Sequence, residues 1–127
     1  MTALDTNVLI YACDRADPRR QKIAIDLVAD SRDGVLLWQV ACEFVAASRK
    51  LGSQGFTPSY AWSRLAEFLA VLRLVLPTPA VLQRSQIFHI THGVSFWDAL
   101  ILAACAEAGV ETLYSEDVPA TRAWGSL

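Results

Sequence analysis

Three carboxylate side chains, Asp5, Glu43 and Asp98, stand in apolar surroundings in this sequence, where an ionised acid is costly. A fourth acid, Asp117, follows the short run at residues 112–115. The stretches around them contain no Lys or Arg that is an obvious partner. Burying an ionised carboxylate without compensation costs several kcal/mol or more. We therefore expect a divalent cation to supply the missing positive charge.

The type of ligand indicates which ion and which reaction these acids serve. Carboxylate oxygens favour Mg²⁺ or Mn²⁺ over zinc. With one or two such ions, the natural reaction is the metal-assisted attack of water on a phosphodiester. The acids therefore predict phosphodiester hydrolysis.

Short β-rich runs that alternate with helical segments must position these acids. The first predicted strand ends at Leu4–Asp5, and the other three predicted strands cover residues 35–38, 73–76 and 111–115. The predicted helices cover residues 7–13, 18–30, 39–51, 58–72, 78–91 and 95–107. This alternation predicts a single α/β domain over residues 1–127, a three-layer sandwich whose short, mostly parallel sheet is flanked by helices. An apolar stripe in the fourth helix is expected to lie in the core or in an interface, and it consists of Trp62, Leu65, Leu69 and Leu72.

The predicted strands also indicate where the acids meet. Ligand sites in parallel α/β sheets gather beyond the carboxyl ends of the strands. Asp5 and Asp117 fall at such ends, whereas Glu43 and Asp98 lie near the start of helices that follow or face them. We therefore expect the four carboxylates to converge on one edge of the sheet.

Composition excludes several classes of protein. The chain is 54% hydrophobic with a mean hydropathy of +0.32, which argues against disorder. Its apolar runs stop well short of the ~20 residues of a membrane span, and no signal peptide is expected at its start. Cys13, Cys42 and Cys105 are odd in number and stand in apolar helical contexts, which predicts buried free thiols in a cytoplasmic protein.

The chain has a net charge of −2, so nucleic-acid binding would need a local basic patch. One cluster of basic residues could form such a patch. The cluster consists of Arg15, Arg19, Arg20 and Lys22. It is either a solvated helix face or a surface that guides RNA phosphates toward the acids.

Four segments, taken in order, carry a resemblance to a known family. They are LDTNVLIYA at residues 4–12, the helix around Glu43, SFWDALI at residues 95–101 and LYSED at residues 113–117. In this order and spacing they resemble the four motifs of the PIN-domain ribonucleases. The chain looks most like the VapC-type toxins of bacterial and archaeal toxin–antitoxin pairs, over nearly its full length.

The resemblance implies a metal-dependent endoribonuclease that hydrolyses RNA as the toxin of a type II toxin–antitoxin system. It implies that the catalytic, metal-binding acids are Asp5, Glu43, Asp98 and Asp117, with Mg²⁺ or Mn²⁺ as the cofactor. It also implies that Thr6, Asn7 and Ser115 support these acids. The implied partners are a cognate antitoxin that blocks the site and a second copy of the chain in a homodimer.

Each of the four acids also has a purely structural interpretation, which for Asp117 is that of an ordinary acid in a loop. Asp98 follows Ser95 at the spacing of a capping box, and Asp5 is placed to cap the first helix. Glu43 is alternatively a surface acid whose stem alone is buried.

Two other functions remain open. The first is a catalytically degenerate PIN module that only binds a protein partner. It is favoured by the end of the sequence at Leu127, because family members usually continue into a further strand. Asp117 is then expected to be held less firmly. A phosphatase with an aspartate nucleophile is the other alternative, although such enzymes generally carry a second acid where this sequence has Asn7.

Overall fold

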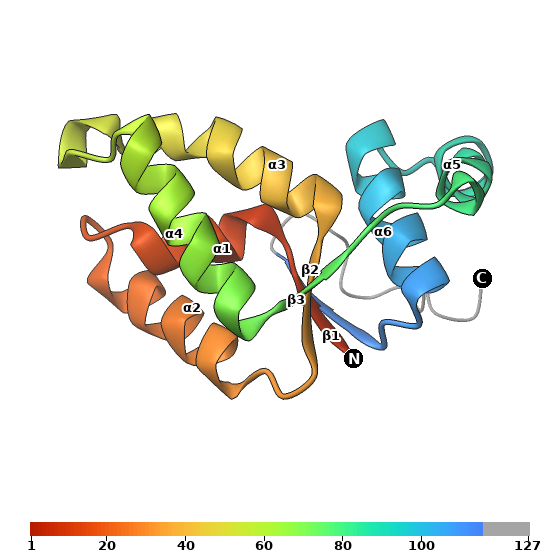
Figure 1. Ribbon diagram of the computed structural model, residues 1–127. Coiled ribbons are helices and arrows are strands. Elements are labelled where there is room, and N and C mark those ends of the chain that lie inside the picture. The colour runs from red at the N-terminus through yellow and green to blue at the C-terminus, as the bar shows by residue number, and fades with distance from the viewer. Residues whose placement is uncertain (116–127) are drawn as a thin grey trace.

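Residues 1–115 are described by a computed structural model, in which four strands and six α-helices alternate (Figure 1). The strands are β1 (Thr2–Leu4), β2 (Gly34–Leu37), β3 (Arg73–Val75) and β4 (Thr112–Tyr114). The α-helices are α1 (Thr6–Cys13), α2 (Pro18–Asp30), α3 (Trp38–Ala47), α4 (Pro58–Val71), α5 (Pro79–Gln86) and α6 (Phe96–Ala108). A 3₁₀ helix (Ser48–Gln54) follows α3, and a π-helical turn (Ile87–Thr91) follows α5.

The four strands form one sheet in the order β3-β2-β1-β4. Every neighbouring pair is parallel, and Ala3 in β1 lies opposite both Val35 in β2 and Leu113 in β4. All four residues of β2 are buried, as expected for a central strand covered on both faces. The predicted α/β sandwich is therefore confirmed, and the sheet is parallel throughout residues 1–115.

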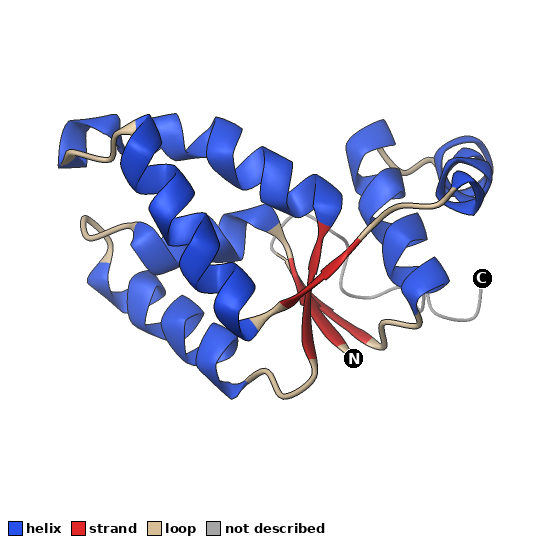
Figure 2. Cartoon of the chain, in the orientation of Figure 1, coloured by secondary structure: helices blue, strands red, loops and turns tan. Residues whose placement is uncertain are grey.

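The helices cover the two faces of the sheet unequally, as Figure 2 shows. The chain steps from β1 to β2 to β3 through α1 to α4, which lie on one face, and then returns past β1 to β4 through α5 and α6 on the other (Figure 1). The strand order therefore reverses between β1 and β4. In α/β proteins the crevice beyond the carboxyl ends of the strands at such a reversal is where ligands bind.

Two apolar cores stabilise the fold, and α6 contributes to both, with Ile101 and Cys105 in the larger one. The larger core, on the side of α1 to α4, is centred on Phe44, which makes edge-to-face contacts with Phe56 and Phe68 at 6.5 and 5.4 Å between ring centroids. The smaller core contains Phe88 from the π-helical turn and apolar residues of α5 and α6. Leu113 of β4 packs against both cores, which makes β4 the strand that joins them. No helix within residues 1–115 is long and apolar enough to cross a bilayer.

The helix boundaries follow local signals in the sequence. Pro18 and Pro58 are the first residues of α2 and α4, where the missing N–H of proline costs nothing. The hydroxyl of Thr57 accepts a hydrogen bond from the Tyr60 amide at 3.1 Å and so caps α4. Helix α6 ends at Gly109, whose φ of 77° lies in the left-handed region that favours glycine.

Two predicted helices differ from the observed ones. The segment 78–91 is divided into α5, which ends at Gln86, and the π-helical turn that follows it. The segment 39–51 is not a single α-helix, because α3 ends at Ala47 and a 3₁₀ helix follows. The Ser48 hydroxyl donates to the Val45 carbonyl at 2.8 Å, a local bond that competes with regular α-helical pairing at this turn.

The prediction that all three cysteines are buried is wrong, and of the two alternatives for the stripe on α4, the core is excluded for Trp62 and Leu69 while the interface stays a prediction. Trp62 and Leu69 are 61% and 40% exposed, whereas Ala61 and Phe68, one position earlier in each case, are buried in the core. Cys42 is exposed on α3, and only Cys13 and Cys105 are the buried free thiols that were expected. In α3 and α4 the face that packs against the core includes alanines. The size of the apolar side chains alone therefore does not identify the buried face of these helices.

The start of β2 provides a test of the packing between the sheet and α4. Gly34→Ala should lower the free energy of unfolding by about 1–3 kcal/mol, as overpacking of a core does. The added Cβ would lie 2.6 Å from Cδ2 of Leu72 and 3.0 Å from the Ser31 carbonyl oxygen. Urea-induced unfolding measures the change. Gly52→Ala is the control, because nothing lies within 4 Å of its Cβ, and it should not be destabilised; equal losses in the two variants would contradict the packing described here.

Candidate functional site

Asp5 lies where β1 ends and α1 begins, and its carboxylate joins two strands. The residue is 5% exposed. Its Oδ1 accepts a hydrogen bond from the Thr6 amide at 2.7 Å, and its Oδ2 accepts one from the Ser115 hydroxyl at 2.6 Å. The Asp5 amide also donates to the Tyr114 carbonyl at 3.0 Å. Asp5 therefore caps α1, as the structural interpretation predicts, and in addition ties the end of β1 to the end of β4.

The charge of Asp5 has no cationic partner among residues 1–115. Both hydrogen bonds to its carboxylate come from neutral donors, and none of the ion pairs within this part of the chain includes it. Cys105 of α6 lies near enough to sense this charge: burial raises the pKa of its thiol to about 12, and the negative charge of Asp5 adds to the rise.

Glu43 lies in the middle of α3 and is half-buried. Its Oε2 accepts a hydrogen bond from the Thr6 hydroxyl at 2.9 Å, and its Oε1 accepts one from Nε2 of Gln39 at 3.1 Å. Glu43 is therefore bound to the residue that follows Asp5, and the interpretation as a solvated surface acid does not hold.

Asp98 is the third residue of α6 and is also half-buried. The Ser95 hydroxyl donates to Oδ2 of Asp98 at 2.9 Å, and no side chain caps the first amides of α6. A capping box requires the opposite arrangement, in which the Ser95 hydroxyl accepts from a backbone amide. The capping interpretation of this pair is therefore wrong, and Oδ1 of Asp98 accepts no hydrogen bond from residues 1–115.

Gln39 connects the start of α6 to the other two acids. Its Nε2 donates to Glu43 and also approaches the Trp97 carbonyl at 3.4 Å, one residue before Asp98. Asp5 and Glu43 are thus linked through Thr6, and Gln39 links Glu43 to the backbone next to Asp98, whose own carboxylate accepts a hydrogen bond only from Ser95 within residues 1–115. The sequence offered a signal for Gln39, since a spacing of four residues places it beside Glu43 on one helix face.

These contacts fit a hard cation in donor type but do not by themselves complete its site. The donors are carboxylate oxygens, which suit Mg²⁺ or Mn²⁺, and a nearly buried carboxylate with neutral partners needs a positive charge nearby. Within residues 1–115, no three His, Cys, Asp or Glu side chains are gathered closely enough to hold a metal ion. The fourth predicted acid, Asp117, lies outside the described residues.

The supporting residues fall beside the acids. Thr6 donates to Glu43 through its hydroxyl and to Asp5 through its amide, and Ser115 donates to Asp5. Asn7 occupies the first turn of α1 and is half-buried.

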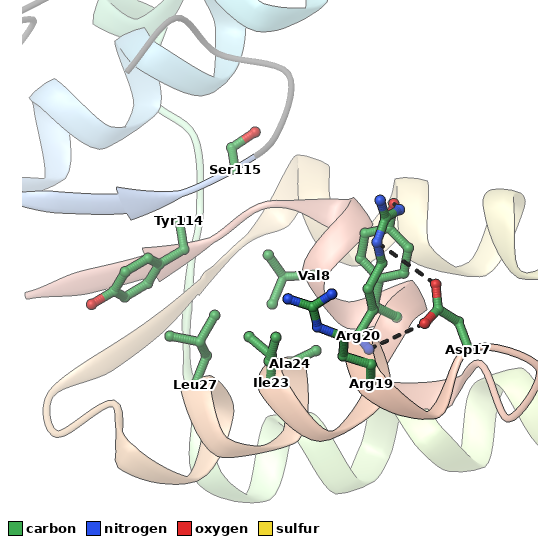
Figure 3. Close-up of a pocket in the computed structure, with 10 residues that line it drawn as sticks. Val8, Asp17, Arg19, Arg20, Ile23, Ala24, Leu27, Tyr114 and Ser115 are labelled. Carbon is green, nitrogen blue, oxygen red and sulfur yellow. Dashed lines mark hydrogen bonds and ion pairs between the residues drawn. The ribbon is translucent and has the colours of Figure 1, made fainter. Parts of the chain in front are cut away.

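The predicted basic cluster is divided between different surfaces. Arg19 and Arg20 line a pocket of about 640 Å³ that Ser115 also lines (Figure 3). Arg15 instead donates to the Gln54 carbonyl at 2.7 Å and lines a different pocket. Lys22 pairs with Asp26 at 3.2 Å and lines neither pocket.

Residues 2–122 match the family model of the PIN domain. The chain belongs to the PIN domain family. PIN domains are typically nucleases that act with divalent metal ions, so the family agrees with the chemistry that the acids predict. No curated protein sequence matches the chain. The PIN resemblance read from the four motifs is confirmed, and the VapC-type subfamily stays a prediction.

Proposed function

We propose that this PIN domain is a metal-dependent endoribonuclease that hydrolyses RNA phosphodiester bonds. The observation that carries the proposal is the buried Asp5 carboxylate, which has only neutral partners in residues 1–115 and lies where the strand order reverses. The Thr6 hydroxyl links this position to a second acid, Glu43. A structural acid would be expected to have a basic partner, which these two lack in the described part of the chain.

Asp5, Glu43, Asp98 and Asp117 would hold Mg²⁺ or Mn²⁺ at this site. Such an ion, when bound, lowers the pKa of a coordinated water and offsets negative charge on the phosphate.

The neighbouring residues orient the carboxylates before any ligand arrives. Each oxygen of Asp5 accepts one hydrogen bond, from Thr6 or Ser115, and keeps a further lone pair for a ligand. Glu43 is held in the same way, with one donor on each oxygen. Partners of this kind set the direction of metal-binding groups, and their loss typically costs about 10–100-fold in metal affinity or activity.

Cleavage of RNA by site variants tests the function. Asp5→Asn and Asp98→Asn should each reduce Mn²⁺-dependent cleavage of a labelled single-stranded RNA by more than about 100-fold, and Ser115→Ala by about 10–100-fold. Asp30→Asn, at the exposed end of α2, should cleave like the wild type. The cleavage rate at saturating RNA is the measurement.

Three outcomes of this assay would contradict the proposal. Asp5→Asn or Asp98→Asn cleaving at the wild-type rate would show that the site is wrongly assigned. A wild type that cleaves no RNA with either metal would favour the degenerate module that only binds a partner. Hydrolysis of a phosphomonoester in place of RNA would favour the phosphatase.

Thermal unfolding tests metal binding independently of activity. A metal ion that binds only the folded state stabilises it by RT ln(1 + [L]/Kd), about 2.7 kcal/mol at a hundredfold excess over Kd. The melting temperature of the wild type should therefore rise by several degrees in Mn²⁺. In EDTA the melting temperature of Asp98→Asn should be no lower than that of the wild type, because the substitution relieves repulsion between acids. In Mn²⁺ the melting temperature of Asp98→Asn should rise by less than that of the wild type. Equal Mn²⁺ increments in the two proteins would exclude Asp98 as a ligand.

We propose further that the chain is the toxin of a type II pair, with a cognate antitoxin that blocks the site, and that it forms a homodimer. What supports a protein partner is an apolar groove of about 670 Å³ between α3, α5 and α6, where large apolar side chains are exposed. They include Trp38, Leu76, Leu82 and Trp97.

Two measurements test these partners. Light scattering should give twice the 13.9 kDa mass of the chain. Co-expression with the product of the adjacent upstream reading frame should suppress RNA cleavage. A monomer in solution would exclude the homodimer, and cleavage that persists in a purified complex would exclude the antitoxin.

A further inference from the structure

The pocket that Arg15 lines has a volume of about 370 Å³ and lies at the end of α1 that is distant from Asp5. Its walls come from the last residues of α1, from α2, from the end of the 3₁₀ helix and from α4. These segments lie on the same side of the molecule, away from α5 and α6 (Figure 1). The volume is within the range of about 300–1,000 Å³ that is usual for small-molecule sites. Asp5, Glu43 and Asp98 do not line this pocket, so it is separate from the candidate site.

The pocket carries a local excess of positive charge. Among the described residues that line it, the charged ones are Arg15 and Arg64. Burial raises the pKa of the Cys13 thiol, which also lines the pocket, so this group is neutral at pH 7 and repels no anion. Two cations with no lining acid in residues 1–115 make this concave surface suitable for a negatively charged ligand.

Arg15 is held in place and still has donors for a ligand. Its amide donates to Oε1 of Gln54 at 3.0 Å, and one guanidinium nitrogen donates to the Gln54 carbonyl at 2.7 Å. Gln54 is itself fixed, because its Nε2 donates to Oδ1 of Asp14 at 2.7 Å. The remaining guanidinium N–H groups of Arg15 bond to no residue within 1–115. A side chain that is oriented in advance loses less entropy when a ligand binds.

Arg64 reaches the pocket from α4 and is also fixed by its neighbours. It pairs with Glu67, lies 5.4 Å from the centre of the Phe68 ring and interacts with the Cys13 thiol. Glu67 does not line the pocket, and its side chain is 62% exposed, so solvent weakens its attraction for Arg64. An anion inside the pocket is screened less than Glu67 and can pair with both arginines.

The lining groups suit a phosphate that is attached to a small ring. A guanidinium group presents parallel N–H donors that match the oxygens of a phosphate. Phe56 and Tyr60 form an aromatic wall, with 4.7 Å between their ring centroids, and Ile25 adds apolar surface from α2. The pocket thus offers paired cations for a phosphate and an apolar wall for the group that carries it.

We propose that this pocket binds a small phosphorylated molecule, with the phosphate between Arg15 and Arg64 and the ring against Phe56 and Tyr60. The proposal does not depend on the endoribonuclease function, because the pocket shares none of the described acids. A ligand in the pocket contacts α1, α2 and α4 together and binds only the folded chain, so it stabilises the fold.

Isothermal titration calorimetry in EDTA, at constant ionic strength, tests the pocket with inorganic phosphate and with adenosine 5′-monophosphate. Both should bind the wild type, the nucleotide more tightly because its ring adds contacts, and adenosine should bind at least about 10-fold more weakly than the nucleotide. Arg15→Ala should weaken the binding of phosphate and nucleotide by about 10–100-fold, the effect of losing a hydrogen bond to a charged group. Arg64→Lys keeps the charge but loses the parallel donors, so it should also weaken both.

Arg49→Ala is the matched control, because Arg49 is exposed on the adjoining 3₁₀ helix and does not line the pocket. It should bind phosphate and the nucleotide like the wild type. Arg15 is equally exposed, so its variant should remain folded.

Thermal unfolding in phosphate provides a second measurement. Phosphate stabilises proteins in general because it is excluded from their surface, and every variant should show that rise in melting temperature. The rise that belongs to the pocket is the additional one, which the wild type and Arg49→Ala should show and Arg15→Ala should lack.

Three results would overturn the proposal. The first is that neither phosphate nor the nucleotide binds the wild type at millimolar concentration. The second is equal affinity of the nucleotide for the wild type and Arg15→Ala, which would place the nucleotide at another site. The third is that Arg15→Ala weakens the binding of a labelled single-stranded RNA while phosphate and the nucleotide do not bind, which would make Arg15 a contact of an RNA backbone.

Cleavage of RNA distinguishes this site from the candidate nuclease site. Arg15→Ala should cleave RNA like the wild type, because Arg15 lies outside the contacts that hold the acids. If the wild type does not cleave RNA but binds phosphate through Arg15, the nuclease fails and the pocket stands. If the wild type cleaves RNA but Arg15→Ala and Arg49→Ala bind phosphate equally, the pocket is overturned and the nuclease stands.

Discussion

The structure depends on an acid buried at the end of its central strand. Asp5 lies where the strand order of the described sheet reverses, between β1 and β4, and helices cover both faces of the sheet there. Its carboxylate can remain there because donors come from the helix that it begins and from the residue after β4. The same geometry that makes this position costly for a charge also makes it the natural crevice for a ligand. Among residues 1–115, Glu43 is linked to this point through Thr6, whose amide donates to Asp5 and whose hydroxyl donates to Glu43.

Hydroxyl and amide side chains add polar links between the helices around the site. Thr6 joins α1 to α3, and Gln39 joins α3 to the start of α6, a helix that contributes to both apolar cores. The acids are thus held by polar contacts that run across the sheet edge, while the cores fix the helices from behind. This division explains why small polar residues are as important to the geometry as the acids themselves.

Local signals predicted most of the fold, because proline, glycine and capping residues act on their immediate neighbours. Pro18, Pro58 and Gly109 mark helix boundaries in the sequence as they do in the structure. What failed depended on partners distant in sequence. The buried face of α4 includes Ala61, whose small side chain fits against a neighbouring element that the sequence does not reveal, and so the sequence left open whether Trp62 lies in the core. For the same reason the basic cluster looked continuous in sequence, although Arg15 and Arg19 line different pockets.

The position of Ser115 also determines when the site can form. Asp5 belongs to the first strand of the sheet, and the donor that fixes its Oδ2 follows the last described strand, 110 residues later. Contacts so distant in sequence form late, because the intervening chain must first be brought together. On the ribosome, α1 to α4 can begin to pack while β4 is still unsynthesised. A nascent chain of this protein therefore contains its first acid long before it has the strand that orients it, and the oriented site is among the last parts of the domain to appear.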